Sequence, residues 1–173
     1  MIIYLVGYMG TGKSHLGKML AQLLDFDFID TDQLIEDRVG KPISKIFDED
    51  GENAFRSYEA ELIRELNTEN TIVSCGGGLP CFNDNMDYLL IKGRVIWIKS
   101  SVKDIVDRVI EGDERPLLKD QKHKLTNYIK THLKSRKPIY QRSHIKVWNR
   151  GPEISTINRI ITYLRYLDSV SSE

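Results

Sequence analysis

The first residues whose types and spacing could do chemistry are Gly7-Tyr-Met-Gly-Thr-Gly-Lys-Ser14. They fit the pattern G-x-x-x-x-G-K-[S/T], whose glycines let backbone N–H groups wrap a phosphate. Lys13 would then reach the β- and γ-phosphates of a nucleotide, and Ser14 would ligate Mg²⁺. An accidental glycine-rich turn is the alternative. Because the stretch follows an apolar, strand-like run and opens a helix-like one, we expect nucleotide binding instead.

Two carboxylates, Asp30 and Asp32, follow in the sequence "IDTD". If the segment is extended, residues two apart project to the same side of it. One carboxylate could then hold Mg²⁺, directly or through water, while the other meets a substrate hydroxyl. In isolation such a pair would be read as solvated loop acids or as the cap of the helix-like "QLIEDRV". Beside a phosphate loop, the catalytic interpretation is favoured.

A run of glycines and three arginines are less specific on their own. The glycines of "CGGGLP" (75–80) would allow a ligand to approach the backbone closely, or would simply form a flexible turn. Arg56, Arg115 and Arg136 lie in "AFRSYE", "ERPLL" and "SRKPIY". Surface arginines are usually solvated or paired with carboxylates. Their position in the fold must therefore decide their role.

Composition limits the class of protein. The chain has 173 residues, 40% hydrophobic and 29% charged, with 25 basic and 25 acidic side chains. This predicts one globular domain over 1–173 with a full core, and no nucleic-acid-binding surface. No apolar segment approaches the length of a membrane span, so we expect a cytoplasmic protein without a membrane partner. Cys75 and Cys81 lack the spacing of a zinc site, and we expect both to be reduced thiols.

The elements that must position these residues alternate between strands and helices. Candidate strands are rich in Ile, Val and aromatic residues: 2–6, 26–30, 71–75, 94–99 and 144–148. Apolar residues recur at helical spacing between them, and Ser101 with Asp104 forms a capping-box pattern. Alternation of this kind predicts a parallel sheet covered by helices on both faces. Two segments interrupt it, a helical one over 33–67 and a polar one over 111–120, and such insertions cluster where ligands bind.

Taken together in order and spacing, these motifs resemble the shikimate kinases, small P-loop kinases related to nucleoside-monophosphate kinases. The matching motifs, which extend to about residue 148, are "GYMGTGKSHLGKMLA", "FIDTDQLIE", "GENAFRSYE", "VSCGGG", "RPLL" and "SRKPIY". The resemblance implies a five-stranded parallel α/β sheet of order 2-3-1-4-5, a substrate-binding region around 31–60 and a lid around 110–122. It also implies phosphoryl transfer from ATP to the 3-hydroxyl of shikimate in aromatic amino-acid biosynthesis, with Mg²⁺, by a monomer.

The same resemblance assigns roles to individual residues. Phosphate and adenine contacts fall on Gly10, Thr11, Gly12, Lys13, Ser14, His15, Arg108 and the lid residue Arg115. Metal contacts fall on Ser14 and Asp30, and the candidate catalytic groups are Lys13, Asp32 and Arg115. The substrate carboxylate and hydroxyls are assigned to Asp32, Arg56, Gly77, Gly78 and Arg136. A pair of arginines suits a carboxylate because guanidinium is a planar fork matching two oxygens.

The chain departs from the family pattern at three points. His15 stands where another hydroxyl residue is usual, and Cys75 stands where Thr or Ser is common before the glycines. The loop after the last strand is short, which leaves Asn149 and Arg150 as guesses for adenine contacts. Two alternatives stay open: a kinase for gluconate or a nucleoside monophosphate, which should lack the carboxylate-binding set, and a nucleotide-binding module without catalysis, which should have lost catalytic residues.

Overall fold

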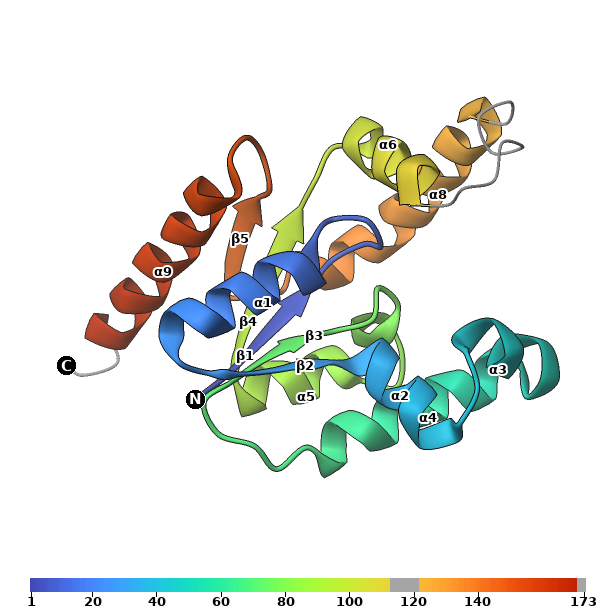
Figure 1. Ribbon diagram of the computed structural model, residues 1–173, viewed down its shortest axis with the longest axis horizontal. Helices are drawn as coiled ribbons and strands as arrows, with labels where there is room; N and C mark the ends of the chain where they lie inside the picture. The colour runs from blue at the N-terminus through green and yellow to red at the C-terminus, as the bar shows by residue number, and fades with distance from the viewer. Residues whose placement is uncertain (113–121, 171–173) are drawn as a thin grey trace.

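The computed structural model describes residues 1–112 and 122–170, and its centre is a five-stranded, all-parallel sheet (Figure 1). The strand order is β2-β3-β1-β4-β5, which confirms the predicted topology. In chain order the strands are β1 (Ile2–Val6), β2 (Asp27–Asp30), β3 (Thr71–Ser74), β4 (Arg94–Lys99) and β5 (Ile145–Trp148).

Helices connect successive strands, as parallel pairing requires. They are α1 (Lys13–Leu24), α2 (Thr31–Val39), α3 (Ile43–Glu49), α4 (Gly51–Glu65), the 3₁₀ turn η1 (Leu79–Cys81), α5 (Asn85–Lys92), α6 (Val102–Gly112), α8 (Lys122–Tyr140) and α9 (Glu153–Val170). Ser101 and Asp104 form the predicted capping box at the start of α6, with reciprocal bonds of 3.1 and 3.3 Å.

The core forms two apolar layers because alternate residues of each strand point to opposite faces of the sheet. Ile3 and Leu5 of β1 pack with α1 and α9, whereas Tyr4 and Val6 pack against the side that α5, α8 and the end of α4 cover. Both faces are therefore dry, as expected for a parallel sheet. Cys75 is a free thiol in the second layer, where burial raises its pKa.

Three strands are one residue shorter than predicted: 27–30, 71–74 and 145–148 in place of 26–30, 71–75 and 144–148. At β2 the reason is the end of α1. Asp25 adopts a left-handed conformation with φ of 54°, and the N–H of Phe26 bonds to the carbonyl of Ala21. Phe26 therefore completes the cap of α1 and is not part of the strand.

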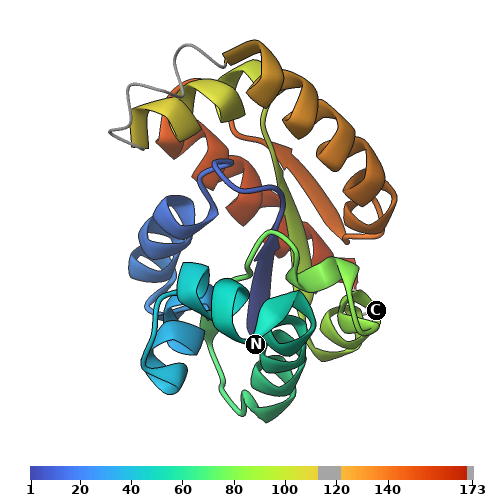
Figure 2. The same ribbon diagram turned by 90° about the vertical axis from the view of Figure 1, so that its right-hand side faces the viewer.

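Two groups of helices project beyond the carboxyl end of the sheet, on either side of the loop between β1 and α1 (Figures 1 and 2). One group is α2, α3 and α4, which agrees with the predicted helical insertion. The other is α6 with α8; most of the lid predicted around 110–122 lies outside the described residues. No helix within the described ranges is long and apolar enough to cross a membrane.

Candidate active site

The loop from Gly7 to Gly12 connects β1 to α1 and places Lys13 at the first position of the helix. Gly12 has φ of 88°, and a Cβ there would lie 2.7 Å from the side-chain amide of Asn149. That amide donates to the carbonyl of Thr11 at 3.0 Å, so the residue that follows β5 supports the loop. Gly10, also at positive φ, lies against α6. The loop thus has the backbone conformation that a phosphate cradle needs.

Lys13 is buried beneath this loop and is 8% exposed. Its Nζ donates to the carbonyl of Tyr8 at 2.9 Å. Burial lowers the pKa of Lys13 to about 8, and the nearby carboxylate of Asp32 opposes this change. The nearby carboxylate therefore offsets only part of the cost of burying the Lys13 ammonium, which favours an anionic ligand beside it.

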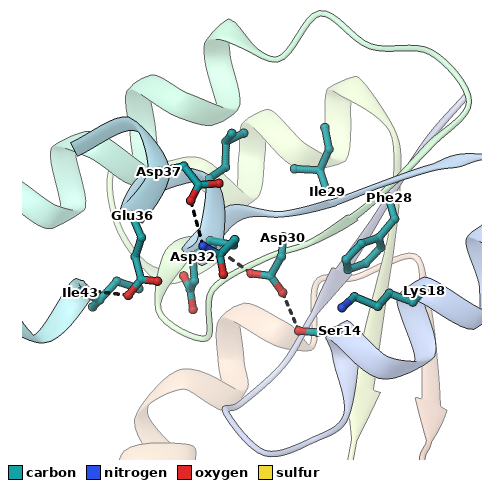
Figure 3. Close-up of a pocket in the computed structure, with 11 residues that line it drawn as sticks. Ser14, Lys18, Phe28, Ile29, Asp30, Asp32, Glu36, Asp37 and Ile43 are labelled. Carbon is teal, nitrogen blue, oxygen red and sulfur yellow. Dashed lines mark hydrogen bonds between the residues drawn. The ribbon is translucent and has the colours of Figure 1, made fainter. Parts of the chain in front are cut away.

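Ser14, Asp30 and Ser74 form a cluster of oxygen atoms beside the loop, and Figure 3 shows the contact between Ser14 and Asp30. The Ser14 hydroxyl donates to Oδ2 of Asp30 at 2.6 Å and lies 3.2 Å from the hydroxyl of Ser74. Asp30 ends β2 and pairs in register with Ser74, which ends β3. Hydroxyl and carboxylate oxygens are hard donors of the kind that Mg²⁺ prefers. Alternation along β3 was the available signal for Ser74. Val73 and Cys75 face one side of the sheet, so Ser74 faces the other side.

Asp32 does not lie on an extended segment, and that expectation was wrong. α2 begins at Thr31, so Asp32 occupies its first turn, and its N–H donates to Oδ1 of Asp30 at 3.1 Å. Asp30 thus caps the helix with one oxygen, as the alternative interpretation predicted, and contacts Ser14 with the other; its metal role stays a prediction. Burial and the neighbouring charge of Asp30 raise the pKa of Asp32, whereas Lys13 and Arg56 lower it.

Arg56 lies on α4 and is buried, with 8% of the residue exposed. Nη1 donates to Oε2 of Glu59 at 2.7 Å, and Nη2 donates to Oε1 of Glu52 at 2.9 Å. The guanidinium carbon lies 4.3 Å from the ring centre of Phe82. A Cβ on Gly78 would collide with this guanidinium, so only glycine lets Arg56 adopt this position. Two carboxylates and an aromatic face therefore hold the fork in one orientation.

Glu59 is a functional candidate that sequence reasoning missed. It is 1% exposed, and while Oε2 accepts from Arg56, Oε1 has no hydrogen-bond partner among the described residues. Burial raises the pKa of Glu59 to about 7, against the effect of Arg56. Its position one helical turn after Arg56 was the available signal, because residues three apart on a helix face each other.

Arg136 on α8 reaches the same region from the opposite group of helices. Its guanidinium lies 5.6 Å from the ring centre of Tyr8, and its Nη1 lies 3.7 Å from the position that a Cβ on Gly77 would occupy. No carboxylate of the described residues forms an ion pair with Arg136. The structure thus brings Lys13, Asp32, Arg56, Arg136 and the glycine run together around one end of the sheet.

Two other predicted nucleotide contacts lie around the loop. Arg108 on α6 donates to the carbonyl of Gly10 at 3.0 Å and to the Ser100 hydroxyl at 3.2 Å. His15 is exposed, and its Nε2 pairs with Glu153 at 2.9 Å, so in this structure it contacts the start of α9. Arg115 lies outside the described residues.

A cavity of about 620 Å³ lies beside this site, between α1, β2 and α2 (Figure 3). Carboxylates dominate its polar lining, namely Asp30, Asp32, Glu36 and Asp37, with Lys18 as the one cation among the described residues that line it. Neither Arg56 nor Arg136 lines it. A cation or a hydroxyl-rich ligand suits this cavity, whereas a carboxylate ligand belongs with the arginines on the other side of Asp32.

Comparisons with known proteins identify the family. The family model for shikimate kinase matches residues 9–165. A shikimate kinase from Persephonella marina is 41% identical over 94% of this chain and 98% of its own. Among solved structures, shikimate kinase from Bacteroides thetaiotaomicron superposes with a TM-score of 0.88 at 33% identity, covering 95% of this chain and 98% of the other. The enzyme from Acinetobacter baumannii, solved in complex with shikimate, gives 0.86 at 32% identity, covering 95% and 93%. The chain belongs to the shikimate kinase family.

Proposed function

We propose that this protein transfers the γ-phosphoryl group of ATP to the 3-hydroxyl of shikimate, giving ADP and shikimate 3-phosphate. The observation that carries the proposal is the position of two arginines, Arg56 on α4 and Arg136 on α8, beside a phosphate loop of the kinase type. Two guanidinium forks suit a substrate that carries a carboxylate, because each fork matches two oxygens. The complex of a relative with shikimate supports the same choice.

The reaction requires mainly positioning and neutralisation of charge. Lys13 accompanies the transferred phosphoryl group, and Arg115, which lies outside the described residues, is assigned the same task of neutralising phosphate charge. Asp32 accepts a hydrogen bond from the attacking hydroxyl, and its raised pKa favours acceptance of the proton. In a loose transition state that proton leaves late, so Asp32 acts first by orienting the nucleophile.

Mg²⁺ fits the cluster of Ser14, Asp30 and Ser74. Mg²⁺ usually keeps several waters and takes few protein ligands in addition to phosphate oxygens. The described residues accordingly hold no cluster of three or more acidic, histidine or cysteine side chains that would bind a metal alone. Ser14 would be the direct ligand and Asp30 an acceptor for its water; the bound ion neutralises phosphate charge.

A coupled assay of ADP release tests the proposal. We expect ADP release from ATP with shikimate, and none above background with gluconate or with nucleoside monophosphates. Excess chelator should abolish turnover, and added Mg²⁺ should restore it. Turnover with another acceptor but not with shikimate would overturn the substrate assignment, whereas full turnover in chelator would overturn the metal assignment alone.

A further inference from the structure

A second cavity, of about 160 Å³, lies between β4, β5, α6 and α8, near the carboxyl ends of the two strands (Figure 2 shows α8 running beside them). Trp97 of β4 and Trp148 of β5 line it, and they are the two tryptophans of the chain. Ile105 and Leu133 add aliphatic surface from α6 and α8. Asp32, Arg56 and Arg136 do not line this cavity, so it is separate from the proposed shikimate position.

The polar lining of this cavity is cationic. Lys99 and Lys137 line it, and the Lys99 ammonium lies 4.3 Å from the ring centre of Trp148 and 5.0 Å from that of Trp97. Arg150 covers Trp148 at 4.0 Å. Neither these cations nor the neighbouring Lys146 forms an ion pair with a carboxylate among the described residues.

The positive charge is therefore uncompensated at this cavity. Burial lowers the pKa of Lys99, and the charges of Lys137, Lys146 and Arg150 lower it further. No acidic group contributes in the opposite direction. Cation–π attraction to the indole faces offsets part of the free-energy cost of keeping Lys99 charged, but a bound anion would offset more of it.

Size and lining together select a class of ligand. A cavity of roughly 150 Å³ lined by apolar side chains holds one benzene ring. We propose that this cavity binds a small monocyclic aromatic anion, with its ring against the apolar and indole lining and its carboxylate at the ammonium groups of Lys99 and Lys137. The ring gains edge or offset contacts with the indoles, and the carboxylate gains two charge-assisted hydrogen bonds.

This site would be adjacent to the phosphate loop without occupying it. Tyr8 and Thr11 also line the cavity, and the Tyr8 carbonyl is the acceptor for Lys13. A ligand there contacts the rear of the loop that holds the catalytic lysine. The inference concerns a separate site and does not depend on the proposed kinase reaction.

Tryptophan fluorescence measures binding directly, because both tryptophans line the cavity. Benzoate is the probe, benzyl alcohol supplies the ring without the charge, and acetate supplies the charge without the ring. With excitation at the red edge of tryptophan absorption, we expect a saturable change with benzoate. Benzyl alcohol and acetate should each bind at least about tenfold more weakly, since each loses one of the two contact types.

Substitution of Lys99 and competition with shikimate locate the probe. Lys99→Met keeps an apolar stem over the indoles and removes the charge, so benzoate affinity should fall about tenfold or more while circular dichroism stays unchanged. Lys134→Met, at an exposed position of α8 outside the cavity, is the matched control and should bind normally. If Lys99→Met does not fold, Lys137→Met, at an exposed position, replaces it. Saturating shikimate should leave benzoate binding intact.

Several outcomes would overturn the proposal. These are the absence of a saturable response to benzoate, equal responses to benzyl alcohol or acetate, and unchanged affinity in the lysine variants. Displacement of benzoate by shikimate would also overturn it, because benzoate would then be occupying the carboxylate position at Arg56 and Arg136.

Discussion

At the scale of single residues, burial sets the charge states on which the reaction depends. Lys13 and Asp32 lie close enough that each shifts the pKa of the other, and burial disfavours the charged form of both. Their mutual attraction offsets part of that cost. Nucleotide binding would add a much stronger negative charge beside Lys13, so it should raise the pKa of this lysine by a measurable amount.

Lys13→Ala should reduce kcat by about 100-fold or more, the size of effect found for groups that stabilise transition-state charge. The ammonium is expected to follow the transferring phosphoryl group, and alanine cannot replace it. Steady-state kinetics with ATP and shikimate measure the loss, with circular dichroism as the check on folding. Activity within a few-fold of the unsubstituted protein would show that this loop is not the catalytic phosphate site.

ATP affinity should fall as the pH rises above about 8. Without nucleotide, burial holds the pKa of Lys13 at about 8, and phosphate oxygens would raise it in the complex. Above pH 8 the free protein has lost the proton that the complex keeps, so binding must take one up. The dissociation constant should then increase about tenfold by pH 9. Calorimetry in buffers of different ionisation enthalpy measures this proton uptake.

Two variants identify the titrating group. Lys13→Met should bind ATP weakly and without this dependence on pH. Lys18→Met, an exposed lysine on the same helix, should keep the dependence in full. An ATP affinity that stays constant from pH 7 to pH 9 in the unsubstituted protein would contradict the assigned pKa of Lys13.

At the scale of elements, one residue joins a strand, a helix and the phosphate loop. Asp30 ends β2, caps α2 and accepts a hydrogen bond from Ser14 on α1. The cap fixes the first turn of α2, which carries Asp32. The position of the proposed base therefore depends on the same carboxylate that belongs to the proposed metal site.

Asp30→Asn and Asp30→Ala should separate these two roles. Asparagine caps helices about as well as aspartate, so Asp30→Asn should keep the free energy of unfolding, whereas Asp30→Ala should lose about 1 kcal/mol. Both remove the charge beside the metal position, so both should lower kcat and raise the Mg²⁺ concentration needed for half-maximal rate. Urea unfolding and a Mg²⁺ titration of activity measure the two effects. Equal stability of the two variants would refute the capping role, and unchanged Mg²⁺ dependence would refute the metal role.

The strand order was predicted through the resemblance to the family's ordered motifs, whereas the loop between β1 and α1 was predicted from a local pattern of glycines between a strand and a helix. The sequence did not predict that α2 begins at Thr31, because the residues of "IDTD" suit an extended segment as well as a capped turn. Glu59 was missed for a different reason. A glutamate on a charged helix is usually solvated, and only the packing of α4 against η1 and the glycine run shows that this one is buried.

At the scale of the whole molecule, the anion-binding groups come from elements that lie far apart in the chain. Arg56 comes from α4 in one projecting group of helices and Arg136 from α8 in the other (Figure 2). Arg56 is already fixed by Glu52 and Glu59, whereas Arg136 lacks a carboxylate partner among the described residues. A bound carboxylate would therefore connect the two groups of helices.

Replacement of each of the three arginines by alanine should therefore have different effects on shikimate affinity and on kcat. Arg56 and Arg136 would hold a carboxylate that is present in both ground state and transition state, so their loss should chiefly weaken shikimate binding. Arg56→Lys and Arg136→Lys keep the charge but lose the fork, and each should recover only part of the binding. Arg115 would approach the phosphates on closure, so Arg115→Ala should depress kcat more than shikimate affinity. Calorimetric shikimate binding, measured beside steady-state kinetics, distinguishes the two patterns, with ATP affinity of the Arg56 and Arg136 variants as the control. If Arg115→Ala abolished shikimate binding while the other two alanine variants retained it, the carboxylate pocket and the lid would have been assigned to the wrong residues.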